Sequence, residues 1–598
     1  MAWSSSARKA LVIALFAVFT LAGTASAAPR ADAAPDLGPN VKVFDPSMPT
    51  SEIQAAVDAV AREQVSNEFG PQRYALLFKP GTYGSASRPL SFQVGYYTEV
   101  AGLGASPRDV TINGTINVFN QCDASGCLAL TNFWRSLSNL TINVTGGTGC
   151  RTRTEFWAVS QAAPMRRVAV TGGTVSLMDY CTAGPQYASG GFIADSAFSG
   201  GTIVNGSQQQ FLVRNSDLDG WTNGVWNQVF AGDDGAPPQS FPSPPYTTLE
   251  TTPVSREKPY LYVDEGGDLR VFVPDAQSDS RGTTWQTAAT PGHSLPISDF
   301  FVARPSDSAH RIDTELARGK NLILTPGVYG VDRTIDIKRP DTVVLGLGMA
   351  TLTPEDGVVP MRVADVPGVI VAGLTFDAGP VESPVLLQVG TPHSHKGSAA
   401  DPTTIQDVFF RIGGPHAGRA AVTMQVDADD ALLDHIWAWR ADHGDGVGWT
   451  VNTARTGVVV NGDDVTATGL FVEHYQGYEV IWNGERGRTV FFQNEMPYDA
   501  PNQAAWQHDG VLGFAAYKVA DDVGSHEGWG LGSYIYTNVD PTLHASRAFE
   551  APITPGVRFH DLLTVSLNKA GTIDHVINDT GDPVTPTHQG PSTVVSYP

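Results

Sequence analysis

Residues 76–84 read LLFKPGTYG and residues 322–330 read LILTPGVYG, so one short motif occurs twice in the chain. A Gly-Leu-Gly turn follows each copy, in EVAGLG ending at Gly104 and in VVLGLG ending at Gly348. The starts of the two motifs are 246 residues apart, and the ends of the two turns are 244 residues apart. A short helical pattern precedes each copy, at residues 53–62 and 312–318. This long-range similarity indicates two related halves.

Each half consists of short runs rich in Val, Ile, Thr and Phe, separated by Gly, Asn and Asp turns. Examples are NLTINV, GVIVAGLTF, AAVTMQV and TGLFVEH. This composition is typical of strands, and no long helical periodicity separates the runs. The runs recur at about 20–25 residues, which is typical of a β-solenoid whose coils stack about 4.8 Å apart. We predict an all-β fold of two tandem right-handed parallel β-helices packed side by side, with few short helices.

The predicted N-terminal β-helix covers residues 28–235, and the C-terminal one, which carries the catalytic acid, covers residues 295–598. Residues 236–294 lie between them. They begin with the Pro-rich APPQSFPSPPY and continue into YLYVDEGGDLRVFV, which is hairpin-like. We therefore predict that residues 236–294 form a linker and hairpin crossing between the halves.

The N-terminus has the pattern of an export signal. Arg8 and Lys9 precede an apolar run over residues 10–21, and Ala25-Ser26-Ala27 follows as a small-x-small cleavage site. We predict a signal peptide over residues 1–27, cleavage near Ala27, and a secreted, extracellular protein. No later apolar stretch approaches the roughly 20 residues that span a bilayer, so we expect no membrane partner.

The charge composition argues against a nucleic-acid partner. The 598 residues include 61 Asp and Glu against 38 Lys and Arg, a formal net charge of −23. An acidic surface repels phosphates, and no run of Lys or Arg reverses this locally. We expect a monomer.

All four cysteines, Cys122, Cys127, Cys150 and Cys181, fall within 60 residues. Export makes disulfides permissible. Of the three possible pairings we favour Cys122–Cys127 with Cys150–Cys181, because it needs only local loops. A zinc site is the weaker alternative, because no Cys-x-x-Cys pair or flanking His accompanies the cysteines.

Unusual residues are densest over residues 437–506, where two glutamates stand out. Glu473, in FVEH, and Glu495, in QNEMPYD, each follow an apolar strand and are 22 residues apart, about one coil. Residues one coil apart stack on one wall, with backbones about 5 Å apart. Two such carboxylates suit the splitting of a glycosidic bond, and repulsion with partial burial would raise one pKa. The alternative is that both are solvated turn carboxylates.

Aromatic side chains accompany the two glutamates. Trp437 and Trp439 share strand parity, and four more aromatic residues follow nearby: Trp449, Trp482, Tyr498 and Trp506. Flat rings beside carboxylates suit stacking on sugar rings, although alternate tryptophans are equally consistent with a core. Asp442, His443 and Asp445 fit no specific metal template, so we predict no metal site.

The chain resembles bacterial members of glycoside hydrolase family 55. The tandem KPGTYG and TPGVYG segments, the stretch from WAWRADHGDGVGW to QNEMPYD, and SHEGWGLGSYIYTNVD carry this resemblance. WAVSQAAPMRRV and NGSQQQFLVRNS extend it into the first half. The resemblance implies a secreted, inverting exo-β-1,3-glucanase that releases glucose from laminarin-type glucans. It also implies an active site in the cleft between two β-helices.

The resemblance implies roles for individual residues as well. Glu495 matches the general acid, and Glu473 matches a carboxylate that positions the attacking water. Gln161, in AVSQAAP, and Ser189, in YASGGF, match a glutamine and a serine around that water. Trp439 and Tyr498 match the aromatic walls of the sugar subsite nearest the acid. The predicted substrate-binding set also includes Trp437, Trp449, Asp442 and His443. The partner is a β-1,3-glucan, and no cofactor is expected.

Two other functions are consistent with a β-helix. One is another polysaccharide-cleaving enzyme, of the polygalacturonase or lyase type. Asp463-Asp464 is similar to the paired aspartates of pectin-hydrolysing β-helices, but the Arg-Ile-Lys and Gly-His-Gly segments that accompany them are missing. The other is a non-catalytic solenoid that only binds glycans, in which Glu473 and Glu495 would be dispensable.

Overall fold

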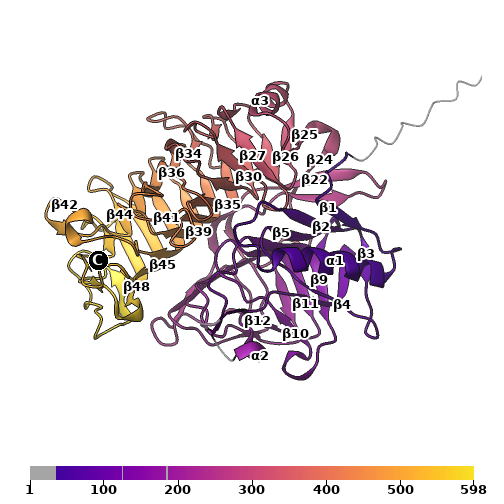
Figure 1. Ribbon diagram of the computed structural model, residues 1–598, viewed down its shortest axis with the longest axis horizontal. Coiled ribbons are helices and arrows are strands. Elements are labelled where there is room, and N and C mark those ends of the chain that lie inside the picture. Colours follow the sequence, from indigo (N-terminus) through magenta and orange to yellow (C-terminus); the bar gives the residue numbers. More distant parts are fainter. Residues whose placement is uncertain (1–34, 124–125, 184–185) are drawn as a thin grey trace, which may run out of the picture.

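Two parallel β-helices lie side by side in the molecule (Figure 1). The computed structural model describes residues 35–123, 126–183 and 186–598, and the predicted signal peptide lies outside these ranges. In Figure 1 the first β-helix is indigo to purple at the lower right, and the second runs from pink at the top to yellow at the lower left. The predicted all-β, parallel β-helix class is confirmed.

The first β-helix is built around one long sheet whose main strands pair in parallel, one per coil. Its path is β1 (Val41–Phe44), β2 (Tyr74–Phe78), β5 (Thr98–Gly102), β9 (Arg135–Val144), β11 (Pro164–Thr171), β13 (Phe192–Ala194), β16 (Gln210–Arg214), β18 (Asn227–Ala231) and β19 (Tyr246–Leu249). A shorter sheet joins β10 (Thr154–Phe156), β12 (Thr174–Ser176), β15 (Ile203–Val204) and β17 (Trp221–Thr222).

The second β-helix has two long sheets. One follows β25 (Phe300–Ala303), β26 (Asn321–Leu324), β29 (Val343–Gly346), β32 (Ile370–Ala372), β35 (Thr404–Ile412), β37 (Leu432–Arg440), β39 (Thr466–Glu473), β41 (Gly487–Glu495), β45 (His526–Ile535), β48 (Val557–Ser566) and the antiparallel β50 (Ser592–Tyr597). The other follows β28 (Ile335–Ile337), β31 (Met361–Val363), β34 (Ser383–Val389), β36 (Ala420–Val426), β38 (Ala454–Val460), β40 (Val480–Trp482), β44 (Tyr517–Val519) and β47 (Phe549–Glu550).

A helix lies near the start of each β-helix, as the repeated pattern predicts. α1 (Thr50–Gln64) buries Ile53, Val57 and Val60 in the first core, and α3 (Ala309–Ala317) buries Ile312 and Leu316 in the second. These positions are three or four residues apart, the spacing that places side chains on one face of a helix.

Coil length varies more than the sequence spacing suggests. Leu432 pairs with Thr466 and Thr466 pairs with Arg488, so these coils take 34 and 22 residues, whereas Gly487 pairs with His526, 39 residues further on. The expected 20–25 residues therefore holds only for the shorter coils. The hydrogen-bonded ladder fixes the strand positions, and the extra residues form loops between strands.

The crossing segment contains the expected hairpin. β21 (Tyr260–Val263) and β22 (Leu269–Pro274) pair antiparallel, and β24 (Gly292–Pro296) adds a third strand. The first sheet, however, continues past residue 235, because β19 pairs with β18 in parallel. The Pro-rich stretch is therefore a loop between two strands of the first β-helix, and it is not the crossing itself.

Buried ion pairs join the two β-helices. Arg166 and Arg214 of the first approach Asp407 and Asp434 of the second, with N–O distances of 2.8 Å for Arg166–Asp407 and 2.7 Å for Arg214–Asp434. Glu257 of the crossing segment lies 2.5 Å from Arg214. All five side chains are almost fully buried. Each charge has an opposite partner, which offsets the cost of removing it from water.

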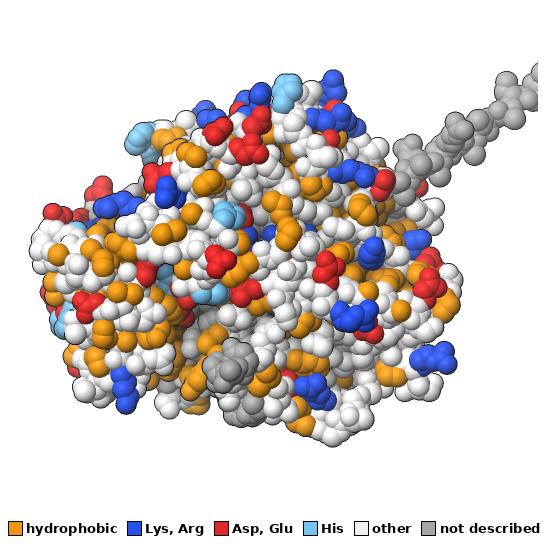
Figure 2. All heavy atoms as spheres, in the orientation of Figure 1, with side chains coloured by type: hydrophobic (Ala, Val, Ile, Leu, Met, Phe, Trp, Pro, Cys, Tyr) orange, Lys and Arg blue, Asp and Glu red, His pale blue; other side chains and the backbone are white. Residues whose placement is uncertain are grey.

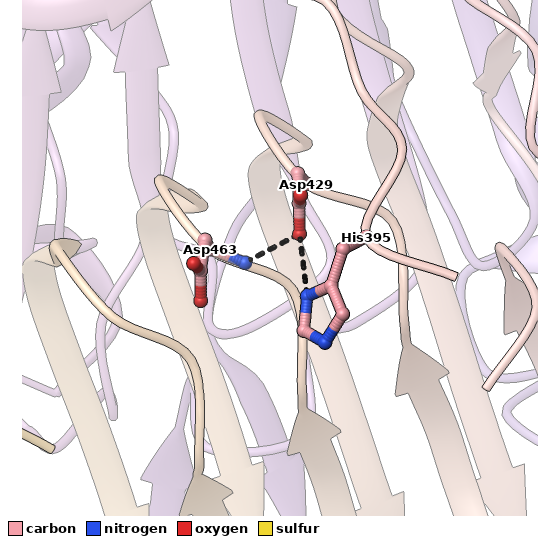
Figure 3. A group of neighbouring side chains, drawn as sticks. All are labelled: His395, Asp429 and Asp463. Carbon is pink, nitrogen blue, oxygen red and sulfur yellow. Dashed lines mark hydrogen bonds and ion pairs between the residues drawn. The ribbon is translucent and has the colours of Figure 1, made fainter. Parts of the chain in front are cut away.

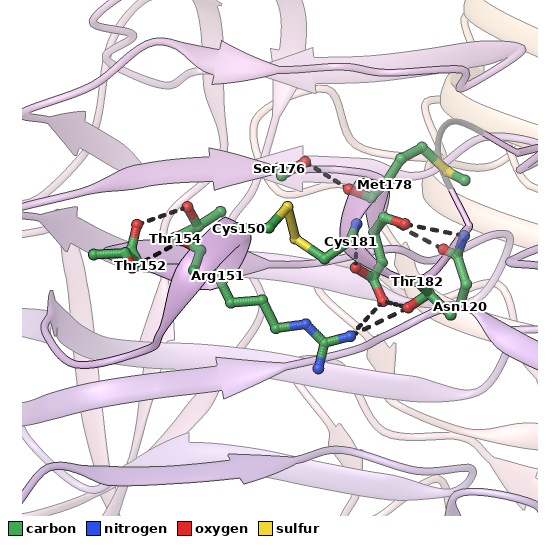
Figure 4. Close-up of a disulfide and its surroundings, with 11 residues drawn as sticks. Asn120, Cys150, Arg151, Thr152, Thr154, Ser176, Met178, Cys181 and Thr182 are labelled. Atoms are coloured by element: carbon green, nitrogen blue, oxygen red, sulfur yellow. Dashed lines mark hydrogen bonds and ion pairs between the residues drawn. A yellow bond between two sulfur atoms is a disulfide. The ribbon is translucent and has the colours of Figure 1, made fainter.

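The two predicted disulfides are present. Cys122–Cys127 closes the hairpin of β7 (Gln121–Asp123) and β8 (Gly126–Leu128), and Cys150–Cys181 joins a 3₁₀ turn to α2 (Tyr180–Ala183). Figure 4 shows Arg151 beside Cys150–Cys181. The Arg151 guanidinium donates to Asp179 Oδ2 across 3.0 Å. The bond closes a 31-residue separation just before the segment that contains Ser189.

Basic side chains on the face in Figure 2 are scattered among acidic, polar and hydrophobic ones and do not form one band. Over the ranges that the structure describes, no helix is long and apolar enough to cross a membrane.

Candidate active site

A cavity of about 630 Å³ lies between the two β-helices. Loops of the first half contribute Phe133, Gln161 and Ser189 to its wall, and the second half contributes Glu473 and Glu495. Trp439, Asp442, His443, His474, Tyr498 and Tyr536 complete the region around these carboxylates. The cavity is therefore a shared site that neither half could form alone.

Glu473 and Glu495 lie on neighbouring coils, as their spacing predicts. Each ends its strand, Glu473 in β39 and Glu495 in β41. These strands pair in parallel, and the backbone N–H of His474 donates to the carbonyl of Glu495 across 2.8 Å. His474 has a φ of 70°, a conformation that is uncommon for residues other than Gly and that turns the chain after Glu473. Both glutamates are almost fully buried, yet both line the cavity.

A chain of polar side chains ends on Glu473. Trp437 Nε1 donates to Glu473 Oε2 across 2.8 Å, and Gln161 Nε2 donates to Glu473 Oε1 across 2.7 Å. Ser189 Oγ in turn donates to Gln161 Oε1 across 2.7 Å. Both oxygens of Glu473 are thereby occupied, and the hydroxyl of Ser189 is connected to the carboxylate through a buried amide.

The environment of Glu495 differs. Burial, together with the charge of Asp442, raises the pKa of Glu495 to about 7, although a hydrogen bond from the Tyr498 hydroxyl opposes the rise. Burial, together with the charge of Glu495, raises the pKa of Glu473 well above its ordinary range. Two adjacent buried carboxylates cannot both ionise without cost, so one proton remains in the pair near neutral pH.

Aromatic rings surround the carboxylates. Trp439 and Tyr498 both line the cavity, Trp439 stacking on Trp437 with ring centroids 5.1 Å apart. Tyr498 contacts the rings of His474 at 4.4 Å and Tyr536 at 4.8 Å. These contacts fix the orientation of both walls.

Two of the predicted substrate-binding residues lie outside the cavity lining. Trp437 is fully buried, because it packs against Phe133 and Trp134 of the first half at 4.7 and 5.4 Å, and it reaches the site only through its bond to Glu473. Trp449 packs against the core of the second β-helix, with Arg440 5.6 Å from its ring.

The sequence reasoning missed several residues at the site, including Phe133, Tyr536 and Glu68. His443 Nε2 lies 2.7 Å from Glu68 Oε1, and its Nδ1 lies 2.9 Å from Asp442 Oδ1. Burial alone would lower the pKa of His443, but these two hydrogen bonds raise it to about 10. The imidazolium therefore links the two halves at the cavity. No local motif marks Glu68, which follows α1 some 375 residues before His443.

A group with metal-like composition lies elsewhere, at loops of the second β-helix. Within the described residues, ligand atoms of His395, Asp429 and Asp463 lie within 4.8 Å of one another (Figure 3). Asp429 Oδ1 accepts the backbone N–H of Asp463 across 2.8 Å, and Asp463 Oδ1 accepts that of Glu485 across 2.9 Å. Each carboxylate thus accepts a backbone N–H from the next coil. This structural role accounts for the clustering of these side chains without a metal ion.

Comparison of the sequence with known proteins finds a family model and a relative that match it. Residues 300–495 match the family model described as LAM55 pectate lyase-like domain. An exo-beta-1,3-glucanase of Streptomyces sp. (strain SirexAA-E / ActE) is 52% identical over 564 residues, which cover 94% of this chain and 90% of that protein.

Two solved structures show the same likeness along 94% of the chain. The structure of sacteLam55A from Streptomyces sp. SirexAA-E superposes with a TM-score of 0.89 at 52% identity, covering 94% of this chain and 99% of that one. A variant of that protein in complex with glucose superposes equally well, with a TM-score of 0.89 at 51% identity and the same coverage of both chains.

Proposed function

The chain belongs to glycoside hydrolase family 55, the family of the Streptomyces exo-β-1,3-glucanase, and on that premise we propose how its cavity cleaves a glucan. The protein is an exo-β-1,3-glucanase, a glycoside hydrolase that converts β-1,3-glucan to glucose. We assign catalysis to the shared cavity. The single observation that carries this assignment is the pair of buried glutamates, Glu473 and Glu495, on adjacent coils beside Trp439 and Tyr498.

Glu495 is the general acid of this proposal. Burial and the charge of Glu495 raise the pKa of Glu473 as well, but Glu473 receives N–H donors on both oxygens, from Trp437 and Gln161, and we take these donors to stabilise its anionic form over that of Glu495. The proton therefore belongs on Glu495, whose pKa of about 7 keeps a large protonated fraction at neutral pH. From there it passes to the oxygen of the departing glucan as the glycosidic bond breaks.

The attacking water belongs at the other end of the relay, beside Glu473, Gln161 and Ser189. Glu473 is poorly suited to attack the sugar itself, because both of its oxygens already accept hydrogen bonds. A water held by this chain attacks the sugar from the face opposite the leaving group and inverts the anomeric centre. The water gives its proton to Ser189 Oγ, the Ser189 proton moves to Gln161 Oε1, and Gln161 Nε2 gives a proton to Glu473, so Glu473 gains one proton while Glu495 loses one to the leaving group.

Two features of the sequence support secretion. Residues 1–27 have the pattern of a cleavable signal peptide, and the four cysteines form two disulfides, which persist in oxidising compartments. Comparing the N-terminal sequence of protein recovered from the culture medium with that of cell-associated protein tests this.

The test of the function follows the products of laminarin with time. We expect glucose alone from the start, and NMR of the first turnovers should show α-glucose, the product of inversion. Polygalacturonate serves as the control for the lyase or polygalacturonase alternative and should not be cleaved. A ladder of oligomers would contradict exo action, β-glucose would contradict inversion, and no reducing sugar from any glucan would favour a binding protein.

A further inference from the structure

The salt bridge between Glu68 and His443, called the bridge below, lies at the boundary between two hollows. His443 lines the catalytic cavity, and Glu68 lines a second hollow of about 270 Å³. The two hollows share Leu128, Leu130 and Thr131 as lining residues. The bridge and these residues therefore separate the catalytic cavity from a space large enough for a further sugar.

The bridge joins the two β-helices. Glu68 follows α1 in the first half, whereas His443 follows β37 in the second. The imidazole is held on both sides, by Glu68 at 2.7 Å and by Asp442 at 2.9 Å, and its ring lies 5.3 Å from Trp439 and 5.6 Å from Phe69. The side chain of His443 is only about one-third exposed, at 36%. Several independent contacts thus hold the ring in place.

The position of the bridge follows from the order of the coils. The terminal sugar of the proposed function lies near Trp439 and Tyr498, beside the acid Glu495. The bridge lies at the end of the cavity formed by the coil of Trp439, and later coils supply Tyr536 and Asn568 to the rest of the wall. A second sugar on the side of Trp439 would have to pass the ring of His443.

From this arrangement we infer that the Glu68–His443 bridge is the end wall that restricts cleavage to the last glucosyl unit of a chain. This inference rests on the proposed function, because it places the terminal sugar beside Glu495. Glu68 and His443 are specificity-determining residues in this reading. Opening the bridge would connect the cavity with the second hollow, which would then accept the next glucosyl unit on the non-reducing side and permit internal cleavage.

The substrate that tests this is laminarin oxidised by periodate and then reduced. Periodate cleaves vicinal diols, which inner 3-linked glucosyl units lack and the terminal units possess. The oxidised glucan therefore has no intact chain end for an exo enzyme, while its interior remains open to an endo enzyme. Intact laminarin is measured beside it, and the ratio of the two rates is the readout, since it does not depend on an overall loss of kcat.

Glu68→Ala and His443→Ala are compared with Glu63→Ala, a control at an exposed glutamate of α1 that bonds to the Tyr74 hydroxyl. We expect each bridge variant to raise the ratio about tenfold or more, the scale of discrimination by a small change in a pocket, and to release oligomers. The control should keep the wild-type ratio and release only glucose.

The inference is overturned if both folded bridge variants release glucose alone and leave the oxidised glucan intact. Circular dichroism and thermal unfolding establish that each variant is folded, and either one suffices if the other is not. Failure of the proposed function would look different: the wild-type protein would then release no glucose from intact laminarin.

Discussion

Gln161 of the first β-helix donates to Glu473 of the second across 2.7 Å, although 312 residues separate them in the chain. The bond crosses the interface between the two halves and connects Ser189 with a buried carboxylate. This hydrogen-bonded chain is thus assembled only when the two β-helices dock. Under the proposed mechanism, catalysis therefore depends on docking.

The first prediction concerns the acid. Glu495→Gln removes the transferable proton while keeping the shape of the side chain, so hydrolysis of laminarin should fall by about 10²- to 10⁴-fold. Oligosaccharide binding, measured by calorimetry, should persist because Trp439 and Tyr498 are unchanged. Glu527→Gln, on the neighbouring strand β45 and 40% exposed, is the control and should retain normal activity. A variant with more than a tenth of the wild-type rate would reject Glu495 as the acid.

The second prediction concerns pH. The active form carries a proton on Glu495, so kcat/KM should fall as pH rises through about 7. Asp442 raises the pKa of Glu495 by its charge, so in Asp442→Asn the fall of kcat/KM should occur at lower pH. The Tyr498 hydroxyl lowers that pKa by hydrogen bonding, so in Tyr498→Phe the fall of kcat/KM should occur at higher pH.

Opposite shifts distinguish this electrostatic account from general damage to the site, because damage lowers the rate without moving the midpoint. Asp445→Asn, at an exposed aspartate of the same loop, provides the control and should leave the midpoint in place. Midpoints that move together in the two test variants would argue against Glu495 as the titrating group.

The third prediction concerns the relay. Gln161→Ala breaks the connection between Ser189 and Glu473, so kcat should fall by about 10- to 100-fold while KM changes little. Azide needs no proton removed before it attacks, so it should restore part of the turnover in Gln161→Ala. Glu495→Gln should gain nothing from azide, because its leaving group still lacks a proton. Equal responses in the two variants would assign Gln161 a structural role only.

The sequence reveals the features that depend on local pattern. The 22-residue spacing of Glu473 and Glu495 equals one coil of β39 and β41, so their stacking follows from the strand ladder alone. The pairing of Cys122 with Cys127 likewise follows from a short loop. Similarity to a family supplied Gln161 and Ser189, which no spacing argument connects to Glu473.

Contacts between the halves are different, because they depend on how two solenoids dock. Glu68 and His443 meet only through that docking, and no periodicity in either half records it. Strand parity places Trp437 and Trp439 on one face. It cannot show that Trp134 of the first half contacts both rings, at 5.4 and 5.6 Å, or that Trp439 alone lines the cavity. The lengths of the loops could not be predicted either. The strand ladder fixes where strands pair, but it does not fix how many residues connect them, as in the 39-residue coil from Gly487 to His526.

The fourth prediction concerns stability at the docking interface. Arg214→Met leaves Asp434 and Glu257 without their nearest cation, so the free energy of unfolding should fall by about 3–5 kcal/mol. The matched control is Arg486→Met at a half-exposed ion pair with Asp464, where the loss should be about 0–1 kcal/mol. Urea unfolding followed by tryptophan fluorescence measures both, and equal losses would show that burial adds nothing to the interface.

The same cluster predicts how stability depends on pH. Burial alone would raise the pKa of Asp407 and of Asp434, but the adjacent Arg166 and Arg214 hold both values below the ordinary range. A carboxylate whose pKa is lower when folded stabilises the fold above its unfolded pKa of about 4, and this contribution disappears as pH falls toward the folded value. The urea concentration at the midpoint of unfolding should therefore decrease in the wild type as the pH is lowered below 4. The drop should be smaller in Asp407→Asn, which has lost one such group, and an identical acid profile in the two proteins would contradict the assignment.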